Sequence, residues 1–417
     1  MNAWFHFLHY WLSFAFRAWF KRVYYHHDAP LPDDGPIIYA CTHPNSAIDY
    51  LFAPLITVKP TFVLVRGDVF EKKILNAIFR SIYMLPVYRI RDGFSSLNKN
   101  EKSFKDCYRE FDNNGRVLIF SEGVCVQEKT LQPIRKGTAR LALDYIHKHG
   151  GKKMYVVPIA TNYSRYRWFR STVMVNFGTP IEASKYDDLY AVNANKAYEA
   201  LTADITGGLQ KRFIEVENYK DDHLTETALM ALRLNRLETR RNWLIDDFSV
   251  FQEERALVDK LNANPELLSS EWYKKAESLE LNAHREGFLK QHFRVDLYLF
   301  QLIILSPFIA LAYLTVALPY GITRWLINNK VKDIIFDTTV TVYGTLVFYL
   351  IQLLIITLVS IGFMGIAGIF IPLSWVLFGA LGVEIVDEYL FALKNWKKLD
   401  RKEAYQSLYQ EVRSLIK

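Results

Sequence analysis

Short apolar runs alternate with helix-length segments between residues 30 and 219. The runs are rich in β-branched and aromatic residues, which is typical of buried strands. They lie at residues 36–41, 61–65, 83–88, 117–121, 155–161 and 172–177. In one of the intervening segments, Phe104, Cys107, Tyr108 and Phe111 keep the spacing of an amphipathic helix. The pattern predicts an α/β domain at 30–219: a mostly parallel sheet covered by helices, with its site at the carboxyl ends of the strands.

Two long uncharged blocks follow, at residues 297–322 and 338–383. A helix needs about 20 apolar residues to cross the hydrocarbon core, so the second block has room for two crossings. Its glycines at 362, 365 and 368 favour a tight helical hairpin. We expect transmembrane helices at 295–390, in two or three spans. A first block that re-enters at Ser306-Pro307 would keep every basic flank on the cytoplasmic side, including a basic tail at 391–417.

The two segments that flank the α/β domain differ from it in residue composition and pattern. Residues 1–29 carry aromatic residues at nearly every turn and basic residues only towards the end, without the features of a signal peptide. We expect an amphipathic helix at the membrane interface there, and packing on the following domain is the alternative. Residues 220–294 are charged and Leu-rich without strand signals. They predict a helical connector.

The composition is consistent with contact with lipid and limits the classes of partner that the protein can bind. The 417 residues are 51% hydrophobic and 15% aromatic, which is rich for a purely water-soluble protein. The formal charge of +7 suits nucleic acid, anionic phospholipid or a phosphorylated substrate, and the apolar blocks favour the latter two over nucleic acid. The three cysteines lack metal-ligand or CxxC spacing. We therefore expect a reducing compartment and no metal site.

Polar residues gather where the predicted strands end. His43 and Asp49 follow the first strand, in the stretch THPNSAIDY. An aspartate can hydrogen-bond one imidazole nitrogen and leave the other as a base near neutral pH, although a His near a turn is more often structural. Arg89 and Arg91, in PVYRIRDG, are two residues apart on an extended segment, so both can reach one phosphate. A pair of surface arginines is the alternative.

The later strand ends carry two further clusters. In FSEG, Glu122 and Gly123 follow the end of a strand. A glycine there lets a substrate approach the backbone closely and bind to free N–H groups. Arg135 and Lys136 precede a helix that should begin near Thr138, which is a natural anion site. The last strand contains Pro158, in VVPIATNY, and an edge-strand proline is the plain interpretation of that residue.

These four clusters, in this order, resemble the conserved blocks of the glycerolipid acyltransferase family, which includes glycerol-3-phosphate and lysophosphatidate acyltransferases. The family's blocks are His-x4-Asp, an arginine-bearing stretch, Phe-Pro-Glu-Gly and a Val-Pro-containing strand, and the match covers about residues 30–180. Two positions depart from the pattern: five residues separate His43 from Asp49, and residue 121 is Ser rather than Pro. HPNS and PVYRIRDG look like the glycerol-3-phosphate and dihydroxyacetone-phosphate acyltransferase branch.

The resemblance implies acyl transfer from a thioester, acyl-CoA or acyl carrier protein, to a hydroxyl of glycerol 3-phosphate or of lysophosphatidate, without a metal or other cofactor. It gives His43 the role of base and Asp49 that of its orienter. Arg89, Arg91 and Lys136 would hold the phosphate, and Glu122 and Gly123 would lie at the substrate or the oxyanion. The expected partners are the bilayer, the thioester donor and the phosphorylated acceptor, for an integral membrane protein with its catalytic domain on the cytoplasmic face, the inner membrane in a bacterium. A Cys or Ser hydrolase and a non-enzymatic membrane scaffold are the rival classes; the hydrolase lacks a GxSxG elbow.

Overall fold

The computed structural model describes residues 3–88, 94–218, 222–236, 243–269, 271–279, 295–331, 334–377 and 402–416, with single positions at 379, 383 and 387. The helices are α1 (Ala3–Trp19), α2 (Asp49–Thr57), α3 (Lys73–Ser81), α4 (Phe94–Asp112), α5 (Gly137–Lys148), α6 (Asp187–Val192), α7 (Ala194–Gln210), α8 (Asp222–Arg233), α9 (Ser249–Ala263), α10 (Glu271–Ser278), α11 (Val295–Lys330), α12 (Asp337–Met364) and α14 (Lys402–Ser414). The strands are β1 (Arg22–His27), β2 (Ile37–Cys41), β3 (Phe62–Arg66), β4 (Met84–Val87), β5 (Arg116–Phe120), β6 (Tyr155–Tyr163), β7 (Thr172–Phe177), β8 (Ile181–Glu182) and β9 (Leu244–Asp246).

One sheet of these strands organises the α/β domain. Its order is β4-β3-β5-β2-β6-β7-β1-β9, with β8 paired to β6. The five strands from β4 to β6 are parallel to one another, and β7, β1 and β9 run the opposite way because β6 and β7 pair antiparallel. The prediction of a mostly parallel sheet covered by helices is confirmed. The carboxyl ends of β2, β3, β5 and β6 therefore gather at one edge.

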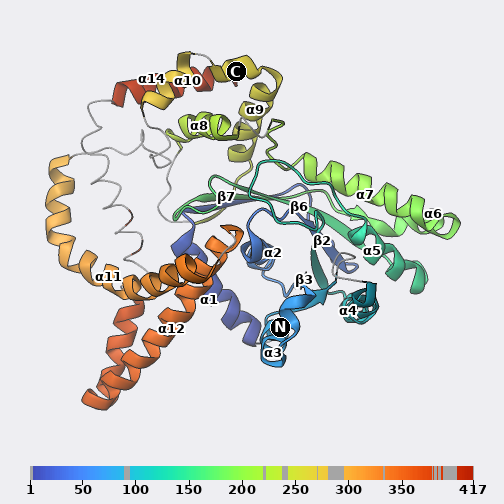
Figure 1. Ribbon diagram of the computed structural model, residues 1–417, viewed down its shortest axis with the longest axis horizontal. Coiled ribbons are helices and arrows are strands. Elements are labelled where there is room, and N and C mark those ends of the chain that lie inside the picture. The colour runs from blue at the N-terminus through green and yellow to red at the C-terminus, as the bar shows by residue number, and fades with distance from the viewer. Residues whose placement is uncertain are drawn as a thin grey trace.

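Each face of the sheet packs against its own layer of helices. Along β2, Ile37, Tyr39 and Cys41 join a core with α1 and α2, whereas Ile38 and Ala40 join a core with α4, α5 and α7 (Figure 1). This alternation is the two-residue period of a strand. Burying a large apolar side chain stabilises the fold by about 1.5–3 kcal/mol, so both layers fix the strand ends in place.

Two predicted segments differ from the structure. The N-terminal helix ends at Trp19, and 22–27 form strand β1, so 1–29 is not one helix. The segment RVYYHH pairs with β7 and β9, a long-range pairing that local patterning did not indicate. The connector likewise contains β9, only three residues long and so too short to show a period.

The helices after the α/β domain form a unit of their own on its edge. Buried residues of α8, α9, α10 and α14 share one core with Tyr24 and Met174 of the sheet. A fully buried ion pair supports it, with Arg233 Nη2 2.6 Å from Glu254 Oε2. The C-terminal segment, predicted to be a basic tail, thus contributes the packed helix α14.

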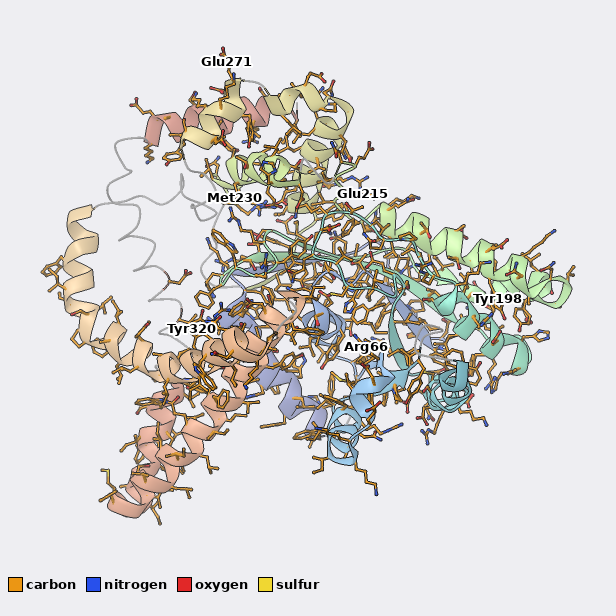
Figure 2. The ribbon with its side chains drawn as sticks, viewed as in Figure 1. Arg66, Tyr198, Glu215, Met230, Glu271 and Tyr320 are labelled. Carbon is orange, nitrogen blue, oxygen red and sulfur yellow. The ribbon has the colours of Figure 1, made fainter. Side chains whose placement is uncertain are left out.

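Two helices are long and apolar enough to cross a membrane, Ile303–Lys330 and 337–377. Only 22% and 11% of their most apolar windows are buried, unlike the core helix of a soluble protein. The first stays helical through Pro307, so re-entry at Ser306-Pro307 was wrong. The second turns back after Met364, where Gly365 takes a φ of +62° (Figures 1 and 2). These helices indicate association with a membrane.

The return of the hairpin requires glycine at one close approach. A Cβ on Gly368 would lie 2.2 Å from the carbonyl oxygen of Ser360. Only a residue without a side chain allows this segment to fold back against α12, as the glycine pattern predicted.

Candidate functional site

The turn after β2 places the first pair of candidate residues. The backbone N–H of Thr42 donates to Ile159, and the hydroxyl of Thr42 accepts from the N–H of Thr161, which tie the strand end to β6. Ser46 then adopts a φ of +52° and starts a short 3-10 helix, Ser46–Ile48. Helix α2 begins at Asp49. The extra residue of this motif is taken up in the turn.

His43 and Asp49 face each other across this turn. Nδ1 of His43 lies 3.1 Å from Oδ2 of Asp49, whose side chain is 1% exposed. A carboxylate can only accept, so Nδ1 carries the proton of this hydrogen bond. The backbone N–H of Asn45 donates to the same oxygen at 2.6 Å. His43 and Asp49 are thus hydrogen-bonded although five residues, not four, separate them.

The other carboxylate oxygen of Asp49 is held by a residue that sequence reasoning missed. The hydroxyl of Tyr163, at the end of β6, donates to Oδ1 at 2.6 Å. Burial raises the pKa of Tyr163 well above its usual range, so the hydroxyl keeps its proton and remains a donor. Three donors thus fix one buried carboxylate. The tyrosine follows VVPIATN directly, but only the fold brings it to Asp49.

Phe120 and Glu122, from the end of β5, support the histidine. The ring of His43 stacks on Phe120, with centroids 3.6 Å apart and planes 15° from parallel. The backbone N–H of His43 donates to Glu122 Oε2 at 2.6 Å, and the N–H of Gln132 donates to Oε1 at 3.0 Å. Burial raises the pKa of Glu122 to about 7, although both backbone donors lower it. Glu122 is 5% exposed, so it braces the turn that carries His43.

Gly123 and Lys136, the other predicted residues that the structure describes, hydrogen-bond to residues other than His43. Gly123 has a φ of +67°, as a turn glycine does, but its N–H already donates to Phe120. Lys136 Nζ contacts Glu199 at 2.8 Å and Asn195 at 3.1 Å on α7. Arg89 and Arg91 lie outside the described residues.

Arg135, predicted beside Lys136, lies at the FSEG turn. A Cβ on Gly123 would meet the side chain of Arg135 at 3.6 Å, and the backbone N–H of Arg135 donates to the carbonyl of Ser121 at 2.8 Å. These contacts place Arg135 next to the turn that contains Glu122.

Pro158 does not lie on an edge strand. It sits in β6, between β2 and β7, opposite Ala40. A Cβ on Gly208 of α7 would lie 2.6 Å from its ring, so it is the glycine that lets α7 approach the proline closely.

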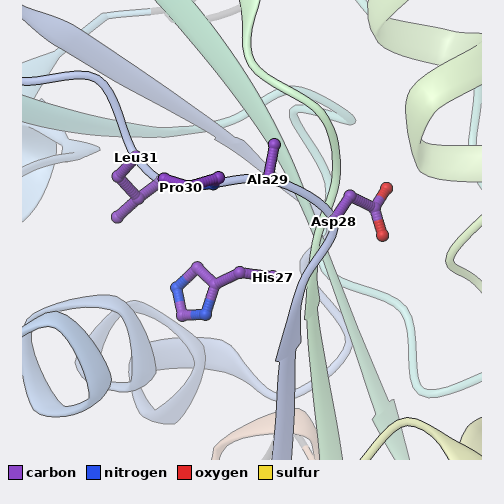
Figure 3. A pocket seen from close by; sticks show the side chains of 5 residues that line it. All are labelled: His27, Asp28, Ala29, Pro30 and Leu31. Atoms are coloured by element: carbon purple, nitrogen blue, oxygen red, sulfur yellow. The ribbon is translucent and has the colours of Figure 1, made fainter.

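A hollow of about 490 Å³ lies elsewhere. It is lined by His27, Asp28, Ala29, Pro30 and Leu31, after the end of β1 (Figure 3). In the sheet register His27 pairs with Phe177, Phe177 with Ile159 and Ile159 with Cys41, so the hollow begins level with the end of β2 but three strands away from it. Among the residues that the structure describes, no three His, Cys, Asp or Glu side chains form a group that could hold a metal ion.

The comparisons with known proteins match the same part of the chain. The family model described as Acyltransferase matches residues 22–162. Glycerol-3-phosphate O-acyltransferase 2 of Saccharomyces cerevisiae is 28% identical over 169 residues, 39% of this chain and 22% of the relative. Glycerol-3-phosphate O-acyltransferase 1 of the same yeast is 30% identical over 135 residues, 31% of this chain and 17% of the relative. The chain thus spans about a fifth of the length of these relatives.

One solved structure aligns with the chain at low overall similarity. The 1-acyl-sn-glycerophosphate (LPA) acyltransferase PlsC of Thermotoga maritima aligns with 48% of this chain and 80% of its own, at 16% identity and a TM-score of 0.32. The matched segment of the family model begins with β1 and ends in β6, so it contains His43, Asp49 and Glu122. The resemblance of this part of the chain to the glycerolipid acyltransferases, nearest the glycerol-3-phosphate acyltransferase branch, is thus confirmed.

Proposed function

We propose that the protein transfers an acyl group from a thioester to a hydroxyl of glycerol 3-phosphate, with His43 as general base. The observation that carries the proposal is the 3.1 Å contact between His43 Nδ1 and Asp49. With Nδ1 donating to the carboxylate, Nε2 is the nitrogen that can take the proton of the acceptor hydroxyl. Asp49 then stabilises the imidazolium that forms.

The reaction needs no covalent enzyme intermediate. The acceptor oxygen attacks the thioester carbonyl while His43 removes its proton, and the thiol leaves as the tetrahedral intermediate collapses. Backbone N–H groups near Gly123, other than its own, are the candidates for the developing oxyanion. Acyl-CoA and acyl carrier protein both supply the required thioester.

The acceptor is proposed from the branch of the family. Both yeast relatives are named for glycerol 3-phosphate, and lysophosphatidate is the second candidate because it too presents a hydroxyl near a phosphate. Arg135, together with Arg89 and Arg91, would hold that phosphate and so position the hydroxyl. The apolar hairpin would keep the acylated product next to a bilayer. The catalytic domain would then face the cytoplasm.

The neighbouring nucleophiles do not favour a hydrolase. Burial raises the pKa of the Cys41 thiol well above its usual value, which disfavours the thiolate. The hydroxyl of Ser121 is hydrogen-bonded to Thr138 at 2.9 Å, and Cys125 Sγ accepts the N–H of Ser46 at 3.2 Å. These contacts support structural roles.

The test is the His43→Ala variant of the full chain, purified in detergent and supplied with an acyl thioester. Glycerol 3-phosphate and lysophosphatidate are offered in parallel, and product position is determined. We expect wild-type acylation of glycerol 3-phosphate and at least a hundredfold loss of kcat in the variant. Retained kcat in a folded variant rules out His43 as base. Acylation of lysophosphatidate alone overturns the assigned acceptor but not the chemistry.

A further inference from the structure

The connection between β6 and β7 combines arginine and aromatic residues. Its sequence at 164–171 is SRYRWFRS, with three arginines and no acidic residue. It follows Tyr163, the residue that donates to Asp49, so it lies at the edge of the sheet that carries His43. No part of the proposed acyl transfer uses its arginines.

Two of its three aromatic side chains are presented to solvent. Trp168 and Phe169 are each 48% exposed, and Arg167 between them and Tyr166 is exposed as well. The guanidinium of Arg165 lies 3.8 Å from the centroid of the Trp168 ring. Exposed tryptophan beside arginine is the combination found where proteins meet lipid headgroups, since the ring tolerates both water and acyl chains and the cation meets phosphate.

The same connection is joined to both apolar elements of the chain. The ring of Phe169 packs on Trp19 at the end of α1, with centroids 5.6 Å apart. The guanidinium of Arg170 donates to the carbonyl of Arg17 at 2.8 Å. At the head of α12, the hydroxyl of Thr338 donates to the carbonyl of Tyr166 at 3.0 Å. A bilayer that surrounds α12 must therefore have its headgroups close to residues 165–169.

We propose that residues 165–169 dock on the headgroup layer of an anionic bilayer. Trp168 and Phe169 enter the interface, and Arg165 and Arg167 lie against lipid phosphates. A bilayer is favoured over a second copy of the chain because the connection begins where the apolar hairpin begins and carries only positive charge.

Docking would reach the catalytic turn through one shared carbonyl. The carbonyl of Tyr166 that accepts from Thr338 also accepts from the side-chain amide of Asn45 at 2.9 Å. The backbone N–H of Asn45 in turn donates to Asp49. Lipid contact at 165–169 therefore bears on the position of the carboxylate beside His43.

The experiment uses the full chain as single copies in nanodiscs. Phe169→Cys is labelled with the environment-sensitive fluorophore NBD in a Cys125→Ser background, since Cys41 and Cys107 are buried. Doxyl-labelled lipids, anionic or neutral, serve as quenchers. The matched control is Val192→Cys on α6, which is 86% exposed and belongs to the helices of the opposite face.

We expect quenching at 169 by doxyl groups near the headgroup and none at 192. Anionic quenchers should act more strongly than neutral ones, and Arg167→Gln should lower that preference by up to about fivefold. Equal behaviour of the two probes overturns the docking. Equal quenching by anionic and neutral lipid, unchanged in Arg167→Gln, overturns the role of the charge. Shielding of the 169 probe in detergent oligomers but not in nanodiscs assigns the surface to a second copy instead.

Discussion

Replacing Asp49 by Asn separates the charge of this residue from its hydrogen bonds. An asparagine oxygen at the Oδ2 position can still accept from His43 and from the N–H of Asn45. Its amide would face Tyr163, whose hydroxyl can accept instead of donate. The histidine therefore keeps its orientation, and the variant loses chiefly the negative charge that stabilises the imidazolium.

The size of the loss follows from the distance. Two unit charges 3.1 Å apart interact by about 5 kcal/mol at an effective dielectric constant of roughly 20. The hydrogen bond that asparagine retains is worth about 1–2 kcal/mol. The difference of about 3–4 kcal/mol predicts a roughly 10²- to 10³-fold lower kcat, at little change in KM.

The assay is thioester-dependent acylation of glycerol 3-phosphate, and the release of free thiol is measured. The comparison variant is Tyr163→Phe, which keeps the charge of Asp49 and leaves one carboxylate oxygen without its 2.6 Å donor. We expect it to lower the unfolding free energy by about 1–3 kcal/mol and kcat by less than about tenfold. If Asp49→Asn keeps more than about a tenth of the wild-type kcat, the electrostatic role is refuted. An equal loss in the two variants shows instead that orientation matters more than charge.

Three further predictions concern stability. Burial raises the pKa of Glu122 to about 7, so the stability that the protonated Glu122 contributes to the folded state is full below pH 4.5 and is lost as the pH rises through 7. Between pH 5 and 8 the melting temperature of the wild type should therefore fall by roughly 5 °C relative to that of Glu122→Gln. Parallel pH profiles of the two melting temperatures would contradict this. Burial alone would raise the pKa of Glu254, yet Arg233 and a second arginine lower it to about 2; Glu254→Gln should cost about 3–5 kcal/mol in denaturant unfolding by removing the buried carboxylate beside the fully buried Arg233, and a loss under about 1 kcal/mol would refute that. Gly368→Ala should lower thermal stability in detergent because its Cβ meets backbone at 2.2 Å, whereas Gly362→Ala, with nothing within 4 Å, should not; equal effects would show that the close approach is not required.

The strands that sequence analysis found are those whose apolar composition indicates that they are buried. The central runs, such as IIYAC in β2 and TVMVNF in β7, are continuously apolar because both faces of the sheet are covered. RVYYHH in β1 has arginine and histidine at its ends rather than an apolar run. It belongs to the sheet because it pairs with residues about 150 positions later in the chain. Such a pairing leaves little trace in local periodicity.

The same division applies to the candidate site. His43, Asp49 and Glu122 were predictable because each follows a strand, and the carboxyl ends of parallel strands meet at one edge. Tyr163 was not, because its contact with Asp49 spans 114 residues and depends on how far β6 extends past β2. Lys136 was predicted at the correct helix start, but its side chain is held by Glu199. A sequence locates a helix terminus without saying which way a flexible cation points.

The apolar hairpin contacts the turn that carries the candidate catalytic pair. At the head of α12, the hydroxyl of Tyr343 donates to the carbonyl of Ala47 at 3.2 Å, within the turn that separates His43 from Asp49. Val342 beside it is buried in the same core as residues of α1, α2 and β2. That turn contains Ser46 at a positive φ, a conformation that persists only when surrounding contacts hold it. Since one of those contacts comes from α12, the geometry of the His43–Asp49 pair and the placement of the hairpin in a bilayer are coupled through the same few residues.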